Sequence, residues 1–311
     1  MTTAKVAAQH SVHSTRAALA SVSLSLVLLI AKIWAAYRTG STAMLGSLAD
    51  TALDLVSSLT TLLGVRIAAM PADLDHRFGH GKAEALVSLA QVVMITVSAI
   101  GIGWRAIDRL INGAETQAMG EGIAVSLLAI LFTFALLWYQ ARVIERTGSV
   151  AIKTDNIHYK SDLFLNMTVV VALVLEQALH IRGADAVIGI GIALWLLWGA
   201  WRASHEAVNQ LMDREWPEQE RQEFLDAAGR YSELQGLHDL RTRKSGTLRF
   251  VQFHVWVPAN WTVQEAHDRL DRVEEELQER FPGTEILIHV DPEGQTDRET
   301  LLSQEITEQA Q

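Results

Sequence analysis

The sequence contains no cysteine. This absence excludes disulfide scaffolds and thiolate metal sites, so histidine, aspartate and glutamate are the side chains left to bind a metal. Basic residues are also few, because 26 lysines and arginines stand against 36 acidic residues, for a formal net charge of −10. The chain therefore lacks the basic footprint of a nucleic-acid-binding protein. Its first 16 residues lack the signal-peptide pattern, so the first apolar stretch is expected to remain as a membrane span.

Charge and hydrophobicity divide the chain near Asp213. Residues 1–213 hold 15 acidic and 15 basic residues, whereas residues 214–311 hold 21 and 11. The hydrophobic share of 49% is too high for an ordinary soluble protein. The sequence therefore predicts a neutral, apolar part followed by an acidic, soluble part.

Six apolar segments have about 20 residues or more, the length that crosses a bilayer core. They lie near residues 16–37, 43–68, 84–108, 120–143, 156–179 and 184–204. We therefore expect a six-helix transmembrane domain over 16–210, preceded by a cytoplasmic N-terminal tail at 1–15. An even number of spans returns the chain to its starting side. A modest excess of lysine and arginine in the loops on that side predicts that both termini are cytoplasmic.

The rest of the chain predicts a small α+β domain over 211–293. A helix begins near Pro217, a β-hairpin turns at Ser245–Gly246, and TEILIHVD forms a closing strand. Between hairpin and closing strand, residues 262–281 form an amphipathic helix. Its apolar stripe consists of Val263, Ala266, Leu270, Val273 and Leu277. The acidic tail, 294–311, is expected to be disordered.

Two predicted spans carry charged pairs with i,i+4 spacing, Asp50 with Asp54 and His158 with Asp162. Such spacing places both side chains of a pair on one helix face. A charged residue at the centre of a membrane helix costs about 2.5–3.5 kcal/mol, so these groups must face one another or water. A single acid could merely cap a helix, but two matched pairs make a set of three carboxylates and one imidazole that suits Zn²⁺ or a similar divalent ion. Lys160 lies on a different face of its helix and is expected to extend to the membrane interface.

Two further groups of possible ligands lie outside the spans. Asp73, His76 and His80 occur in the loop after the second span, although a loop with two histidines is more often simply solvated. The C-terminal part contributes His238, His254, His267, His289 and Asp291. His289 and Asp291 share one face of the closing strand by its period of two. Their spacing alone is equally compatible with scattered surface histidines.

Several motifs resemble the cation diffusion facilitator family, and within it the bacterial zinc/ferrous-iron efflux transporters. They are the DxxxD and HxxxD pairs, PADLDHRFGHGKAEALVSLAQ, HYKSD, LMDREWPEQERQ, HDLRTRKSG and RFPGTEILIHVDP. The resemblance extends from about residue 16 to Pro292 and implies a C-terminal domain with a metallochaperone-like, ferredoxin-like fold. Lys160 departs from the family pattern, where a neutral residue such as glutamine is expected.

The resemblance also implies roles for the candidate residues. A transport site corresponds to Asp50, Asp54, His158 and Asp162, and its histidine is associated in the family with a preference for Zn²⁺ and Cd²⁺ over Mn²⁺. A second site in the loop corresponds to Asp73, His76 and His80. A binuclear zinc site at a dimer interface corresponds to His238, His254, His267, His289 and Asp291. A charge pair that holds two protomers together near the membrane corresponds to Lys82 and Asp213.

The function implied is proton-coupled efflux of divalent metal by a homodimer in the bacterial inner membrane, with Zn²⁺ as both substrate and structural or regulatory ion. Metal and protons compete because the ligands must be deprotonated, and an imidazole with an unperturbed pKa of about 6.5 exchanges protons near neutral pH. Fe²⁺, Cd²⁺, Co²⁺ or Mn²⁺ are alternative substrates. A membrane metal sensor is a second alternative, although it needs no site among the spans. A third alternative is an intramembrane metallohydrolase. Such an enzyme would need an open metal position and a separate general base, and a set of four protein ligands leaves neither evident.

Overall fold

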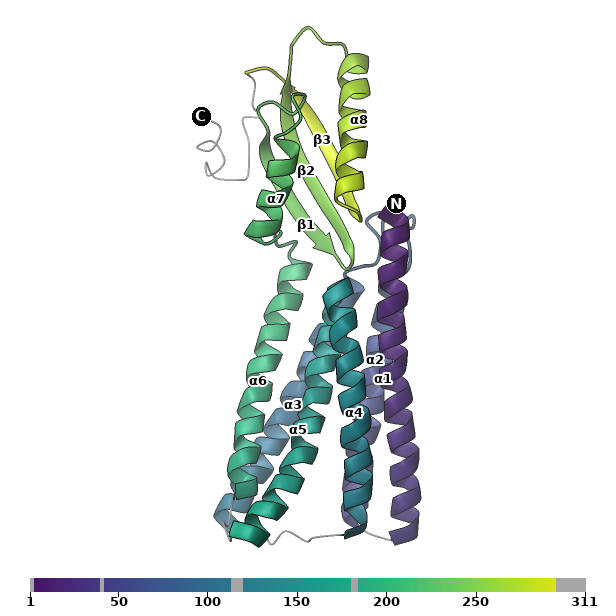
Figure 1. Ribbon diagram of the computed structural model, residues 1–311, viewed down its shortest axis with the longest axis vertical. Helices are drawn as coiled ribbons and strands as arrows, with labels where there is room; N and C mark the ends of the chain where they lie inside the picture. Colours follow the sequence, from purple (N-terminus) through teal and green to yellow (C-terminus); the bar gives the residue numbers. More distant parts are fainter. Residues whose placement is uncertain (1–2, 40–41, 113–119, 180–183, 295–311) are drawn as a thin grey trace.

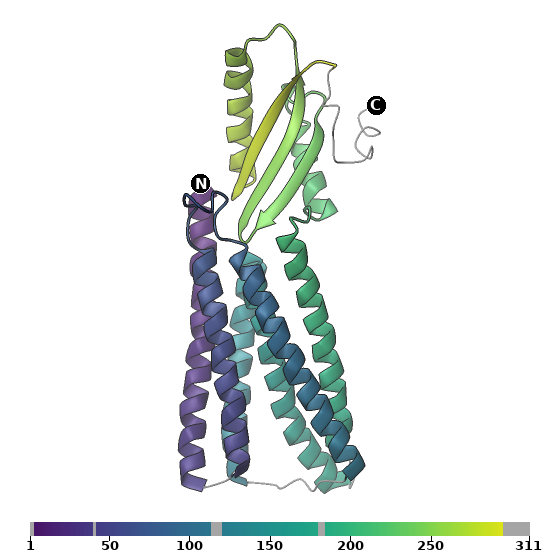
Figure 2. The ribbon, with the colours of Figure 1, turned by 180° about the vertical axis from the view of Figure 1, so that it is seen from behind.

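The structure is a computed structural model that describes residues 3–39, 42–112, 120–179 and 184–294. These residues form a bundle of long helices with an α+β domain standing on one end (Figure 1). The N-terminal end of the first helix lies at the same end of the bundle as this domain (Figures 1 and 2). The bundle helices are α1 (Thr3–Thr39), α2 (Thr42–Ala68), α3 (Ala83–Asn112), α4 (Gly120–Thr147), α5 (Val150–Leu179) and α6 (Ala184–Leu211).

Each of the six predicted spans coincides with a helix of the bundle, and five of these helices contain a described segment that could cross a membrane. Within the described residues, α1, α2, α3, α4 and α6 contain segments long and apolar enough to cross a membrane. Within the described residues α5 is not among them, so a sixth crossing stays a prediction. Residues 3–15, assigned above to a tail, are part of α1, since no glycine or proline interrupts the helix there. The predicted tail at 294–311 lies outside the described residues from 295 onward.

The C-terminal domain has the predicted order of helix, hairpin, helix and strand. Its elements are α7 (Glu218–Ala228), β1 (His238–Ser245), β2 (Leu248–Val257), α8 (Val263–Arg280) and β3 (Thr284–Pro292). In the described part of the chain the sheet has the order β1-β2-β3, antiparallel between β1 and β2 and parallel between β2 and β3. Gly246 forms the hairpin turn with φ +60°, a conformation that glycine adopts without strain. Helix α8 supplies the long crossover that parallel strands require.

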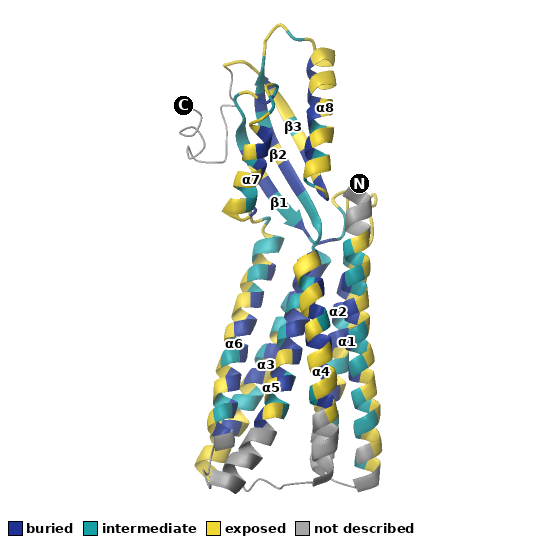
Figure 3. Ribbon diagram, viewed as in Figure 1, coloured by how far each residue is buried: buried dark blue, intermediate teal, exposed yellow. Residues whose placement is uncertain are grey.

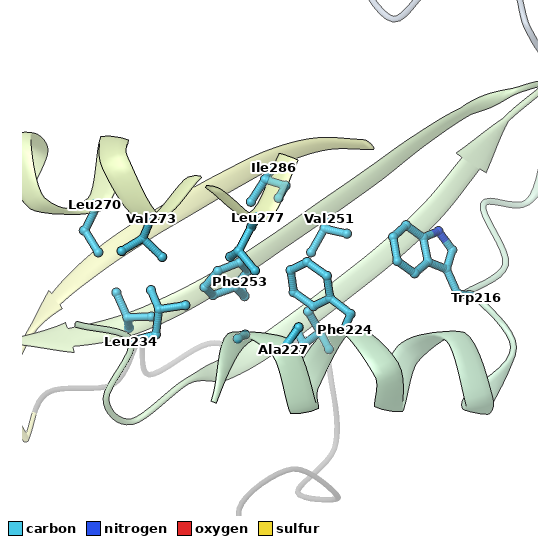
Figure 4. Close-up of a cluster of buried hydrophobic side chains, with 13 residues drawn as sticks. Trp216, Phe224, Ala227, Leu234, Val251, Phe253, Leu270, Val273, Leu277 and Ile286 are labelled. Carbon is cyan, nitrogen blue, oxygen red and sulfur yellow. The ribbon is translucent and has the colours of Figure 1, made fainter. Parts of the chain in front are cut away.

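The core of this domain lies between one face of the sheet and both helices (Figure 4). Val251, Phe253 and Val255 alternate along β2 and are all buried. Phe224 of α7 and Leu277 of α8 pack against them and are fully buried. The opposite face of β2 is therefore free to carry polar side chains.

The predicted apolar stripe of α8 is wrong at one position. Ala266, Leu270, Val273 and Leu277 are buried, but Val263 is 90% exposed. Val263 is the first residue of the helix, directly after the N-cap Thr262, and the helix contacts the core only from its second turn. The end of the helix is stabilised by a capping box instead, in which the Thr262 N–H donates to Glu265 Oε2 at 2.8 Å.

The loop between α2 and α3 packs against the tip of the β1–β2 hairpin. The Phe78 ring lies edge-on to Phe250 with centroids 5.8 Å apart. The Arg243 guanidinium lies over both rings, 4.4 Å and 4.3 Å from their centroids. A Cβ atom added to Gly81 would lie 2.2 Å from the carbonyl oxygen of Ser245, so the two backbones are in direct contact. This junction joins the helix bundle to the C-terminal domain.

Replacing Leu277 by Ala should lower the free energy of unfolding of the C-terminal domain by about 2–5 kcal/mol, because it leaves a cavity in the core. The matched control is Val263→Ala on the same helix, whose exposed side chain should contribute less than about 0.5 kcal/mol. Urea unfolding of the full-length protein, followed by tryptophan fluorescence, measures both. Equal midpoints for the two variants would contradict this assignment of the core.

Candidate functional site

Three of the predicted membrane ligands lie together between α2 and α5. His158 Nε2 is 3.2 Å from Asp54 Oδ1 and 3.8 Å from Asp162 Oδ2. Each residue offers a ligand atom, and these atoms all lie within 4.8 Å of one another. We call Asp54, His158 and Asp162 the membrane cluster. One imidazole and two carboxylates at these distances suit a divalent cation such as Zn²⁺.

The fourth predicted ligand, Asp50, lies one helical turn away from Asp54 and is exposed. Among the described residues, Asp50 is not part of the group whose ligand atoms lie within 4.8 Å. Its role as a ligand therefore stays a prediction. Lys160 is exposed although its neighbours Tyr159 and Ser161 are buried, which confirms that it lies on a different face of α5 from the membrane cluster.

A further carboxylate, Asp155, is fully buried three residues before His158 on α5. Its oxygens accept hydrogen bonds at 2.7–3.4 Å from one side chain on each of α1, α2, α3 and α4, namely Ser21, Thr61, Gln91 and Gln140. Because four neutral donors satisfy it, the carboxylate holds five helices together. Sequence analysis missed Asp155, which stands just before the predicted fifth span. Its spacing of three from His158 was the available signal.

Tyr159 extends this buried polar layer beside the membrane cluster. Its hydroxyl lies 2.5 Å from Ser25 Oγ of α1 and 2.7 Å from Ser58 Oγ of α2. Figure 3 shows buried residues along the bundle helices below the C-terminal domain, and residues 154–156 of α5, before the membrane cluster, are all buried. Further along α5, Phe164 and Met167 are exposed. The membrane cluster is therefore closed by hydrogen-bonded side chains on the side of the C-terminal domain.

Lys32 of α1 is a second residue near the membrane cluster that sequence analysis missed. Its ammonium group donates to Thr51 Oγ1 at 2.6 Å and lies within electrostatic reach of Asp50, Asp54 and Asp162. The signal was available, because a lysine within an apolar span points by default to a functional site.

The loop residues Asp73, His76 and His80 also come together, as the resemblance implies. Asp73 lies 3.3 Å from His76 Nδ1 and 3.4 Å from His80 Nε2, and the ligand atoms of all three lie within 4.8 Å. The backbone N–H groups of His76 and Asp75 donate to Asp73 Oδ1, which lowers the pKa of the Asp73 carboxyl below its ordinary value. Asp73 is therefore an anion over the pH range in which proteins bind metal. We call these three residues the loop cluster.

The strand register brings the histidines of the C-terminal domain side by side. His238 pairs with His254 across β1 and β2, and His254 pairs with His289 across β2 and β3. All three lie on the face of the sheet opposite the core. Asp291 Oδ2 is 3.2 Å from His238 Nε2 and 3.0 Å from His254 Nδ1, and its Oδ1 is 3.6 Å from His289 Nε2. We call His238, His254 and Asp291, whose ligand atoms lie within 4.8 Å, the sheet cluster.

The tautomer of His238 supports metal binding by the sheet cluster. Its Nδ1 lies 2.7 Å from the carbonyl oxygen of Gly236, and a carbonyl only accepts, so Nδ1 carries the proton. Nε2 of the neutral ring then presents a lone pair to the carboxylate of Asp291. Two facing acceptors need a cation between them, either a proton or a metal ion. His80 of the loop cluster repeats this arrangement, with Nδ1 3.2 Å from the Pro71 carbonyl oxygen and Nε2 facing Asp73.

His267 does not join the sheet cluster within one chain. It lies on the exposed face of α8, with Asp268 Oδ1 at 3.7 Å. Its role as a ligand stays a prediction. Asp239, which sequence analysis did not single out, approaches the cluster instead, with Oδ2 3.7 Å from His254 Nε2. It follows His238 directly and has a φ of +47°, an irregularity of β1 that spacing does not reveal.

Lys82 and Asp213 meet at the junction between the bundle and the C-terminal domain. Lys82 Nζ is 2.8 Å from Asp213 Oδ2 and also donates to the carbonyl oxygen of Leu211 at 3.2 Å. Arg243 lies 3.6 Å from Asp213 Oδ1. The pair forms within one chain, and a role in joining two protomers stays a prediction.

Two family models cover most of the chain. Residues 18–212 match a model described as the cation efflux transmembrane domain. Residues 216–293 match a model described as the cytoplasmic domain of cation efflux proteins. The boundary between the two matches lies at the junction described above.

Individual relatives agree with the family models. The cation-efflux pump FieF of Klebsiella pneumoniae is 41% identical over 278 residues, which cover 89% of this chain and 92% of that protein. The cation-efflux pump FieF of Salmonella newport is 40% identical over 285 residues, which cover 92% of this chain and 95% of that protein. Among solved structures, the metal-bound C-terminal domain of the CzcD transporter from Thermotoga maritima is 23% identical over 26% of this chain and all of that one, with a TM-score of 0.25.

Replacing Asp291 by Asn should weaken Zn²⁺ binding by the C-terminal domain by more than about tenfold, because it removes the anion that faces His238 and His254. Equilibrium dialysis with metal analysis of the full-length protein measures the bound Zn²⁺. The control is Asp268→Asn, an exposed acid beside His267. If both variants bind Zn²⁺ equally, the sheet cluster is not a metal site.

Proposed function

The chain belongs to the cation efflux family, the cation diffusion facilitators, and we propose that it exports Zn²⁺ from the cytoplasm in exchange for protons. Family membership makes it a transmembrane cation efflux transporter, which sets aside the intramembrane metallohydrolase and the metal sensor. The choice of metal and the coupling to protons are the parts proposed here.

The membrane cluster is the observation that supports this proposal most. It combines the imidazole of His158 with the carboxylates of Asp54 and Asp162 between two helices of the bundle. An imidazole among carboxylates favours Zn²⁺ over Mn²⁺, which prefers sites made of oxygen alone. Asp50, one turn from Asp54, is the fourth ligand in this proposal.

Proton coupling follows from the chemistry of the same ligands. Zn²⁺ binds neutral imidazole and ionised carboxylate, so each binding event competes with protonation of the cluster. Protons supplied from the side opposite the cytoplasm would displace the metal there. The buried layer around Asp155 must part when the cluster opens toward the C-terminal domain, which is the alternating access that transporters use.

The remaining assignments concern the assembly. We propose a homodimer in the bacterial inner membrane with both termini in the cytoplasm, in contact with membrane lipid and with no nucleic-acid partner. The match of residues 216–293 to a cytoplasmic domain supports this orientation. Metal at the sheet cluster, with His267 and His289 as further ligands, would stabilise the dimer. The loop cluster is a second metal site, and Lys82 with Asp213 braces the protomers near the membrane.

Uptake of Zn²⁺ into proteoliposomes with an imposed pH gradient tests the exchange. Wild-type protein should transport at a rate that rises with the gradient. Asp162→Ala should abolish transport because it removes a ligand that is also a proton acceptor. Lys160→Met, on another face of the same helix, should behave as the wild type. Transport that ignores the gradient, or that survives Asp162→Ala, would disprove the mechanism.

His158→Asp tests the choice of metal. The all-carboxylate cluster should lower the ratio of Zn²⁺ to Mn²⁺ transport by about tenfold or more, equivalent to about 1.4 kcal/mol. Competition between the two metals in the same vesicles measures this ratio, and the same assay ranks Fe²⁺, Cd²⁺ and Co²⁺. An unchanged ratio would show that His158 does not determine selectivity.

A further inference from the structure

The neighbourhood of the membrane cluster contains a lysine on a neighbouring helix. Lys32 lies on α1, a helix that packs against α2. Its Nζ donates to the hydroxyl of Thr51 at 2.6 Å. Thr51 is buried on α2, one residue after Asp50 and three before Asp54. This contact holds the ammonium group beside the helix that supplies the carboxylates.

The surroundings of Lys32 favour a role for its charge. A hydroxyl such as that of Thr51 can be satisfied by a neutral side chain, so the hydrogen bond alone does not require a lysine. The ammonium group is partly buried and lies within electrostatic reach of Asp50, Asp54 and Asp162. A lysine among membrane helices is costly unless anionic groups lie near it, and Asp50 and Asp54 stand one residue before and three residues after its hydrogen-bond partner Thr51.

We propose that Lys32 is a tethered cation of the transport site, which balances the carboxylates when the metal leaves and limits the affinity with which they hold it. The inference rests on the proposed transport function. When Zn²⁺ occupies the membrane cluster, its two positive charges and the ammonium group repel each other across a partly buried region that salt screens only weakly. This repulsion weakens metal binding. When the site is empty, Lys32 reduces the repulsion among the carboxylates, so the metal-free state is stabilised and release is favoured.

Lys32→Met keeps the length and the apolar stem of the side chain but removes the charge. In equilibrium binding experiments on the purified full-length protein, it should bind Zn²⁺ at least about tenfold more tightly than the wild type. In proteoliposomes it should have a lower maximal rate and a lower half-saturating Zn²⁺ concentration. Lys32→Arg, which keeps the charge, should restore both values. A merely structural role would not tighten binding while slowing turnover.

Lys160→Met is the matched control, because it removes an exposed lysine from the other side of the site and should change neither value. Zn²⁺ binding at the loop and sheet clusters could obscure the effect, so a double variant with Asp162→Ala is also measured. The tighter binding caused by Lys32→Met should vanish in this double variant, because the membrane cluster is lost. Lys32→Gln provides the same test if Lys32→Met cannot be recovered from membranes.

The outcomes distinguish this inference from the transport function itself. Suppose that wild-type protein transports Zn²⁺ but Lys32→Met has the same Zn²⁺ affinity and transport rate as Lys160→Met. Lys32 is then not a charge-balancing residue, and the same holds if Lys32→Met binds Zn²⁺ more weakly than the wild type. Tightening that persists with Asp162→Ala would also overturn the inference, because it would arise at another site. If wild-type protein transports no Zn²⁺ at all, the transport function fails and this inference fails with it.

Discussion

A carboxylate buried among membrane helices must receive its hydrogen bonds from those helices, and Asp155 shows how far this constraint shapes the bundle. Its two oxygens accept bonds from one residue on each of four other helices. The next turn of α5 carries His158 and the following one Asp162, so the same contacts that satisfy Asp155 fix the position of these two residues of the membrane cluster. Helix α6 stands apart from this arrangement and packs against α3 and α5 instead. The geometry of the membrane cluster therefore depends on a residue that binds no metal in the proposed function.

In the C-terminal domain, the corresponding constraint is strand register. A shift of one residue between neighbouring strands would move a histidine to the core face of the sheet. The buried residues of β2, among them Val251 and Phe253, prevent such a shift because they must face α7 and α8. The packing of the core therefore determines the alignment of His238, His254 and His289 on the opposite face.

Features that depend on periodicity within one element could be predicted from the sequence. The pairing of His158 with Asp162, the alternation along β2 and the order of elements in the C-terminal domain are of this kind. Contacts between distant elements could not be predicted in the same way. Helical spacing places Asp50 on the same helix face as Asp54. It does not determine that, of these two aspartates, only Asp54 joins the group around His158 among the described residues. Lys32 and Asp155 gain their significance from side chains on other helices, and Val263 lies beyond the reach of the core although its spacing fits the stripe.

The contact between Gly81 and the hairpin has a consequence for the modularity of the protein. The two domains correspond to separate family models, which suggests parts that could be exchanged between relatives. However, Gly81 contacts the backbone of Ser245 so closely that no side chain fits at this position. Beside this contact, the Arg243 guanidinium packs over the Phe78 ring. A chimaera that takes its C-terminal domain from a relative must therefore take the loop from Met70 to Lys82 from the same source. At this junction the loop and the C-terminal domain must therefore be exchanged together, because their contacting surfaces fit only each other.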